Sequence, residues 1–173
     1  MATTYVLRTC NSDMTAYGGF VWPESGPVEC PDWSAEPECG NGLHGLLLGA
    51  GNARLLSWEP NAKWLVVAVD AASVVDLDSK VKFPSGEVFF CGEREGALRY
   101  LEARGADYAA LPGATLTGGN RATLTGGDCA TFLAVYFDAS GRRCIAVAVV
   151  GQKGILPGVA YQTNNRGEFV AIR

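Results

Sequence analysis

The chain has 173 residues, and 48% of them are hydrophobic, which is enough for a folded core and excludes a disordered chain. Its 14 Lys and Arg residues face 18 Asp and Glu residues without any basic stripe, which argues against binding of nucleic acid through its phosphates. No apolar run approaches the length that crosses a membrane, so we expect no membrane partner.

Short strands and turns dominate the first 92 residues. Strands are expected at 5–9, 18–22, 63–69, 74–77, 80–83 and 87–91. The strand over 63–69 (KWLVVAV) is apolar on both faces, which is typical of a central strand. In the strand over 80–83, Lys80 and Lys82 alternate with apolar residues, which is the pattern of a half-exposed edge strand.

One helix is expected, over 93–104. Ala97, Leu98 and Leu101 form its apolar stripe, and Gly105 ends it.

Two copies of an eight-residue repeat follow the helix. The octad Ala-Thr-Leu-Thr-Gly-Gly-Asn/Asp-x occurs at 114–121 and again at 122–129. Because Thr-Leu-Thr alternates, both threonines of an octad face one side of a strand and the leucine faces the other. The Gly-Gly-Asn and Gly-Gly-Asp segments supply the backbone freedom of a tight corner. Repetition at a fixed short period indicates a stacked coil, a β-solenoid.

Stacking of successive octads is expected to place Leu116 over Leu124 inside the coil. The threonines would form an outer ladder, made of Thr115, Thr117, Thr123, Thr125 and Thr131. Two octads are fewer than the three or so repeats that usually bury a solenoid core. An incompletely covered strand edge is a template for a second copy of the chain. We therefore predict a homo-oligomer, a dimer, that forms through the solenoid edge.

The C-terminal residues predict two β-hairpins. Their strands are expected at 132–137 and 144–150, and at 161–163 and 168–172. The predicted fold is mainly β, of the α+β class. It has three parts: a small mixed N-terminal domain at 1–105, a minimal octad β-solenoid at 106–132, and a β-hairpin cap at 133–173.

The strongest candidate for a ligand site surrounds the single histidine, His44, which lies between Gly42 and Gly45. Glycines let the backbone approach a ligand closely, and histidine titrates near neutral pH. Trp33, in a proline-rich loop over 23–42, is a candidate for the mouth of the pocket. A structural histidine in a glycine-rich turn is the alternative.

Signatures of catalysis are sparse. A metal site made of Cys30, Cys39 and His44 would need a fourth ligand and lacks the short Cys-x2–4-Cys spacing of structural zinc sites, so we expect neither a metal nor a cofactor. The chain has neither a Gly-x-Ser-x-Gly nucleophile elbow nor a phosphate-binding Gly-x4-Gly-Lys-Ser/Thr loop. Whether the chain is an enzyme therefore stays open, with the balance against it.

The first residues, MATTYVLRT, contain no charged segment followed by an apolar one, so no signal peptide is predicted. We therefore expect a cytoplasmic protein with six reduced cysteines.

The order of Gly-Leu-His-Gly, a strand and then Glu87 loosely resembles ADP-ribosyltransferase-type folds. That resemblance implies that His44 would contact a nicotinamide dinucleotide and that Glu87 would act on its ribose. An ADP-ribosyl-type transferase or other nucleotide-binding enzyme is therefore an alternative function.

The octads resemble those of bacterial ice-nucleation proteins, whose Ser/Thr-Leu-Thr-Ala-Gly repeats form a β-solenoid with two octads per coil. This resemblance covers residues 114–131 and implies, as another alternative, ice binding by the threonine ladder. The whole chain is also similar to uncharacterised bacterial and phage proteins in which a domain with Cys-Gly-x-Gly-Leu-His-Gly precedes a run of octads. The matching stretches are Tyr17–Phe20, Cys39–Gly45, Lys80–Pro84 and Ala114–Asp128.

The leading hypothesis is a non-enzymatic binding and self-assembly protein. Its short β-solenoid would mediate stacking or dimerisation. The N-terminal domain would hold a pocket near His44 for a small molecule or a protein partner.

Overall fold

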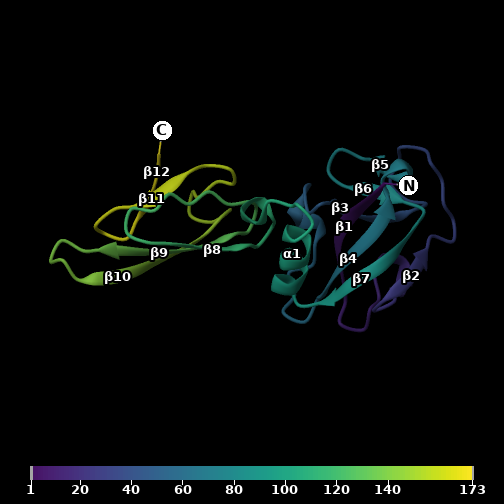
Figure 1. Cartoon of the computed structure of the whole chain (residues 1–173), viewed down its shortest axis with the longest axis horizontal. Coiled ribbons are helices and arrows are strands. Elements are labelled where there is room, and N and C mark those ends of the chain that lie inside the picture. The colour runs from purple at the N-terminus through teal and green to yellow at the C-terminus, as the bar shows by residue number, and fades with distance from the viewer. Residues whose placement is uncertain (1, 173) are drawn as a thin grey trace. The chain divides into compact units, whose positions relative to one another are not determined.

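A computed structural model describes residues 2–172 of the chain. Strands make up 39% of it and helices 12%, so the mainly β fold is confirmed. The chain divides into two compact units, unit 1 (Met1–Ala106) and unit 2 (Asp107–Arg173) (Figure 1). The finer division of unit 2 into a solenoid and a cap stays a prediction. Among residues 2–172, no helix is both long and apolar enough to cross a membrane.

An antiparallel sheet of seven strands forms most of unit 1, in the order β2-β7-β4-β1-β3-β6-β5 (Figure 1). Its strands are β1 (Thr3–Cys10), β2 (Gly26–Glu29), β3 (Leu43–Leu47), β4 (Lys63–Asp70), β5 (Val75–Asp76), β6 (Val81–Phe83) and β7 (Ser85–Gly92). Strand β4 pairs with β1 on one side and with β7 on the other, and it is central as its apolar sequence predicts.

The predicted helix is present as α1 (Arg94–Glu102). Its buried residues are Ala97, Leu98 and Leu101, the stripe that the sequence predicts. The helix contacts β4 and β7. On this side of the sheet, the ring of Tyr100 lies 6.4 Å from that of Tyr5, measured between centroids.

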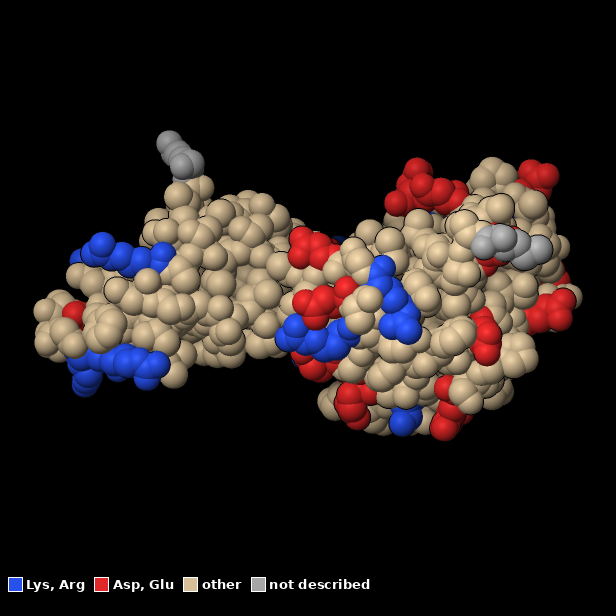
Figure 2. All heavy atoms as spheres, in the orientation of Figure 1, with Lys and Arg blue, Asp and Glu red and all other residues tan. Residues whose placement is uncertain are grey.

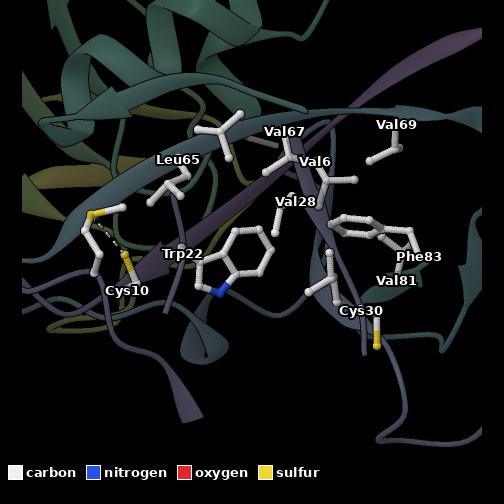
Figure 3. Packing of buried hydrophobic residues seen from close by; sticks show 13 residues of the cluster. Val6, Cys10, Trp22, Val28, Cys30, Leu65, Val67, Val69, Val81 and Phe83 are labelled. Carbon is white, nitrogen blue, oxygen red and sulfur yellow. Dashed lines mark hydrogen bonds between the residues drawn. The ribbon is translucent and has the colours of Figure 1, made fainter. Parts of the chain in front are cut away.

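The main core of unit 1 lies on the other face of the sheet and takes residues from every second position of β1 and β4. Val6 of β1 pairs with Val67 of β4, and both belong to this cluster together with Trp22 and Phe83 (Figure 3). Because side chains alternate along a strand, these residues lie on the face opposite to Tyr5 and α1. Short 3-10 helices complete the chain: η1 (Tyr17–Gly19), η2 (Ala53–Leu55), η3 (Ala71–Ser73) and, in unit 2, η4 (Tyr108–Ala110).

Two local expectations for unit 1 are wrong. Residues 18–22 do not form a strand, because Gly18 and Gly19 adopt positive φ angles of 74° and 77° and the chain turns into η1 there. Lys82 is not on a half-exposed edge: it is 1% exposed, since β6 lies between β3 and the short β5.

Unit 2 contains a three-stranded sheet, in the order β10-β9-β8, and a separate hairpin (Figure 1). Its strands are β8 (Thr115–Gly118), β9 (Thr131–Phe137), β10 (Arg143–Val149), β11 (Tyr161–Thr163) and β12 (Phe169–Ala171). The β9–β10 and β11–β12 pairs are antiparallel and are the two predicted hairpins. The β8–β9 pair is parallel.

The octads stack differently from the expected order. In the parallel pair, Thr115 lies beside Thr131 and Leu116 beside Phe132, so one turn of the chain takes two octads. The second octad lies outside this sheet, and its Leu124 forms a bridge with Tyr161 of β11. The expectation that Leu116 stacks directly over Leu124 is therefore wrong. Both leucines instead pack into one core with Phe132.

Candidate functional site

A hollow of about 940 Å³ opens in unit 1 where β3 separates from β1. The two strands are paired only at Val6–Leu47 and Leu7–Leu46. Gly45 permits this close crossing, because a Cβ atom there would lie 2.4 Å from Val6 Cγ1 and 2.6 Å from the Leu7 carbonyl oxygen. Towards Leu43, the start of β3, the hollow lies between the two strands.

Arg8 of β1 lies where the two strands separate. Its guanidinium donates hydrogen bonds to the carbonyl oxygens of His44, at 3.3 Å, and Thr9, at 3.2 Å. The guanidinium carbon lies 3.8 Å from the centroid of the Trp22 ring. Burial lowers the pKa of Arg8 to about 10, so the side chain stays charged at neutral pH. None of the ion pairs among residues 2–172 includes it.

His44 also lines the hollow. Burial, followed in effect by the charges of Lys80, Arg8 and Lys82, lowers the pKa of His44 to about 4. The expected titration near neutral pH is therefore wrong, and the imidazole is neutral there. Its Nε2 atom is buried and has no hydrogen-bond partner.

Lys80 and Cys39 form a pair at the wall of the hollow. Lys80 Nζ lies 2.9 Å from the Sγ atom of Cys39, which is exposed. This hydrogen bond is the main cause that lowers the pKa of the Cys39 thiol. Sequence reasoning assigned no site role to Arg8 or Lys80. The available signal was a charged residue inside the apolar first strand, TTYVLRTC.

The predicted ligand residues are only partly together. Gly42, His44 and Gly45 line the hollow. Trp33 is not among its lining residues and instead packs beside Gly42 and Lys82, whose Nζ lies 5.5 Å from the centroid of its ring. The four site assignments stay predictions.

The alternative that pairs His44 with Glu87 loses its structural basis. Glu87 lies on β7 and lines a different hollow. Strands β4 and β1 lie between β7 and β3, so three strand spacings of about 4.8 Å place β7 and β3 roughly 14 Å apart. The two side chains therefore do not face one cleft, as ribosyl chemistry by this pair would require.

The metal interpretation of Cys30, Cys39 and His44 is also unsupported. Cys30 Sγ donates to Asp32 Oδ1 at 3.1 Å, while Cys39 is paired with Lys80. Among residues 2–172, His, Cys, Asp and Glu side chains nowhere form a group of three or more that could hold a metal ion.

A second candidate site is the outward side of the sheet in unit 2, which we call the outer face. Along each strand, the side chains of this face alternate with buried side chains such as Phe132, Ala134 and Ala146. Its members are Thr115, Thr117, Thr131, Leu133, Val135, Phe137, Ile145, Val147 and Val149. Figure 2 shows acidic side chains spread over unit 1 and a largely uncharged surface on unit 2.

The outer face is apolar and exposed at its β10 side. Ile145 and Val147 are 63% and 62% exposed. The predicted threonine ladder is divided, because Thr123 and Thr125 belong to the second octad, outside this sheet. Thr123 Oγ1 accepts a hydrogen bond from Gln162 at 3.0 Å. The role of the ladder and of Leu116 and Leu124 in an interface stays a prediction.

The free edge of β10 adjoins this face. The backbone N–H of Val150 donates to the Ala130 carbonyl, and the backbone N–H of Asp138 donates to the Arg142 carbonyl. The backbone groups of the even-numbered residues of β10 therefore bond to β9. The N–H and C=O groups of Ile145 and Val147 consequently point away from β9. In the described part of unit 2, no strand lies beyond β10.

Comparison with known proteins relates both units to others. The model of a family described as a domain of unknown function, DUF7666, matches residues 4–98, which is more than half of the chain. The chain belongs to this family. No solved structure matches this DUF7666 member.

Several curated relatives of this DUF7666 protein are bacterial ice nucleation proteins. The chain is 42% identical to one from Pseudomonas syringae pv. syringae over 114 residues, which are 65% of this chain and 10% of the relative. It is 38% identical to the ice nucleation protein InaU of Pantoea ananas over 107 residues, 61% of this chain and 10% of the relative. The chain thus spans about a tenth of the length of these relatives. The aligned stretches are longer than unit 2 and include part of unit 1.

This similarity contradicts the predicted cytoplasmic location. The prediction rested on where the chain begins, and such an argument does not hold for a chain that spans so little of its relatives.

Proposed function

We propose that the protein is a non-enzymatic binding and self-assembly protein whose unit 2 pairs with a second copy along β10. The observation that carries this proposal is the open backbone edge of β10 beside the exposed side chains of Ile145 and Val147. The similarity to ice nucleation proteins supports a role that needs no catalysis for unit 2, which contains the octads.

Strand β10 lacks the features that keep sheet edges apart. Natural edge strands are blocked by charges, proline, bulges or a covering segment. The seven residues of β10, RCIAVAV, contain no proline, and their only charge is Arg143 at the start. Its pairing with β9 is regular from Arg143 to Val149, without a bulge.

Two copies of β10 can pair in antiparallel orientation and so form a symmetric dimer. Two antiparallel copies can place Ile145 of each chain opposite Val147 of the other, so that the same surface serves both. Both residues direct their free N–H and C=O groups towards that partner. The pairing would join the two outer faces into one continuous apolar sheet surface.

Sedimentation velocity over a range of protein concentrations tests this proposal. We expect the wild-type chain to shift towards the dimer as its concentration rises, and Val147→Lys to remain monomeric because it places a charge at the seam. Val21→Lys is the matched control, because Val21 is also 62% exposed but lies in unit 1. Equal association of Val147→Lys and Val21→Lys would contradict pairing through β10.

Ice binding is a second candidate function. It is favoured by the side-by-side placement of Thr115 and Thr131 on the outer face, with Thr117 next along β8, and by the names of the relatives. If the outer face binds ice, dilute protein will change the habit of growing ice crystals and Thr117→Lys will abolish that change. Unaltered crystals at the highest soluble concentration would exclude it.

A further inference from the structure

Three unsatisfied polar atoms belong to residues that line the hollow of unit 1. Among residues 2–172, five buried side-chain nitrogen or oxygen atoms lack a hydrogen-bond partner. Three of them, Arg8 Nε, Trp22 Nε1 and His44 Nε2, belong to residues that line this hollow. Buried polar atoms are ordinarily bonded, and the arginine and tryptophan nitrogens can only donate. A bound acceptor would satisfy the arginine and tryptophan nitrogens.

The charges around the hollow favour an acceptor that is an anion. The charged side chains that line it are Arg8, Lys80 and Asp32, and His44 is neutral. The Asp32 carboxylate already accepts a hydrogen bond from Cys30. Lys82 adds a third positive charge nearby, since it too lowers the pKa of His44. Residues 1–106 contain 8 basic and 14 acidic residues, so composition alone does not produce this excess of positive charge.

The arginine is the least compensated of these groups. It is mostly buried and holds its charge at neutral pH. Among residues 2–172 it donates hydrogen bonds to two carbonyl oxygens and stacks on the face of Trp22. A buried charge without an opposite charge is costly. A planar guanidinium is also the group that best matches the oxygens of a phosphate or carboxylate. Figure 3 shows the indole nitrogen of Trp22 turned away from Leu65 and Val67.

The size and the aromatic wall of the hollow indicate more than an inorganic ion. Its volume of about 940 Å³ lies in the range of pockets for small organic ligands. Tyr17 and Phe20 line it, and Tyr17 is fully exposed. Aromatic side chains of this kind stack against planar ligands.

We propose that this hollow binds a small organic anion, a planar group that carries a phosphate or a similar oxyanion. The oxyanion lies beside Arg8 and Lys80, and the planar group lies against Tyr17 and Phe20. This ligand class goes beyond self-assembly, and its failure would leave the β10 proposal intact.

Titration of the Trp22 indole N–H signal in an NMR spectrum tests the proposal. The three probes are phenyl phosphate, inorganic phosphate and phenol, added to the full chain at constant ionic strength. We expect saturable shifts with phenyl phosphate, weaker binding of inorganic phosphate and the weakest binding of phenol. Equal affinity for phenyl phosphate and inorganic phosphate would overturn the planar part of the ligand. Shifts that stay linear to about 20 mM phenyl phosphate, an affinity too weak for a built site, would overturn the site itself.

A pair of lysine variants tests the placement of the anion. Lys80→Gln should weaken phenyl phosphate binding about five- to tenfold, because one charge-assisted hydrogen bond is lost at a partly exposed site. Lys63→Gln is the control, since Lys63 is also half-buried in unit 1 but does not line the hollow. Equal affinity of both variants would overturn the assignment of Lys80. Arg8 donates to two backbone carbonyl oxygens, whereas Lys80 bonds to the exposed thiol of Cys39, so the Lys80 variant is expected to fold.

Discussion

Acidification is expected to destabilise unit 1 in part through one side chain, His44. It is the only histidine of the chain, and burial is the largest cause that lowers its pKa from 6.5 to about 4, followed by the charges of Lys80, Arg8 and Lys82. Below pH 6.5 the unfolded chain therefore binds a proton that the folded chain does not bind. The stability contributed by neutral His44 is complete above pH 6.5 and is lost as the pH falls towards 4.

The size of this loss follows from the shift in pKa. A tenfold change in proton affinity corresponds to about 1.4 kcal/mol, so lowering the pKa of His44 from 6.5 to about 4 corresponds to about 3 kcal/mol. The side chain is only partly buried, so solvent screens part of the interaction. We therefore expect the free energy of unfolding to fall by about 1–2 kcal/mol between pH 7 and pH 4, beyond the loss caused by carboxylates.

Urea unfolding at a series of pH values, with His44→Asn as the reference, isolates this contribution. The carboxylates titrate alike in both proteins, so the difference between them belongs to His44. NMR titration of the imidazole gives the pKa directly, and Lys80→Gln should raise it. A pKa of His44 near 6.5, or parallel losses of stability in the wild type and His44→Asn, would contradict this role of His44.

Two further predictions concern the thiols and the octad corner. Cys39 should react with iodoacetamide faster than the other cysteines at pH 7, because it is exposed and its thiol pKa is lowered. Lys80→Gln should slow that reaction, and an unchanged rate would contradict the pairing of Lys80 with Cys39. Gly127→Ala should lower the stability of unit 2 by about 2 kcal/mol or more, since the new Cβ would lie 2.1 Å from the Ala110 carbonyl oxygen. Gly119→Ala, in the other corner, has no atom within 4 Å and should be nearly neutral, and thermal unfolding that does not separate the two variants would contradict the structure of the corner.

The strands that the sequence predicts well are those whose pattern is local. A continuous apolar run marks β4, and two apolar runs around a short polar turn mark β9 and β10. Strand β2 is hidden in the proline-rich loop. Its Pro27 is tolerated because β2 is the outermost strand of the sheet and has a partner on one side only.

The octads show where local pattern stops being informative. Their period of eight residues predicts corners at Gly118-Gly119 and Gly126-Gly127, but it does not say which copies lie side by side. The observed pair joins Thr115 to Thr131, since two corners are needed before the chain returns to the same side. Only long-range packing decides that, including the bridge from Leu124 to Tyr161.

The position of the hollow of unit 1 could be predicted from the sequence, but its cationic side chains could not. The glycines around His44 indicate a close approach of the backbone, and Gly45 does make one with β1. The cationic side chains that give the hollow its character come from positions 8 and 80, far from residue 44 in the chain. The local sequence around Arg8 and around Lys80 does not predict that the sheet order brings these two residues together.

Amide hydrogen exchange at two protein concentrations tests the pairing of β10 most directly. The N–H groups of Ile145 and Val147 point away from β9, so they exchange freely unless a second copy covers them. We expect both amides to exchange more slowly as the protein concentration rises, while the exchange of the outward N–H group of Thr117, on the opposite edge of the sheet, does not change. Rapid exchange of Ile145 and Val147 at concentrations where the chain is dimeric would contradict assembly through β10.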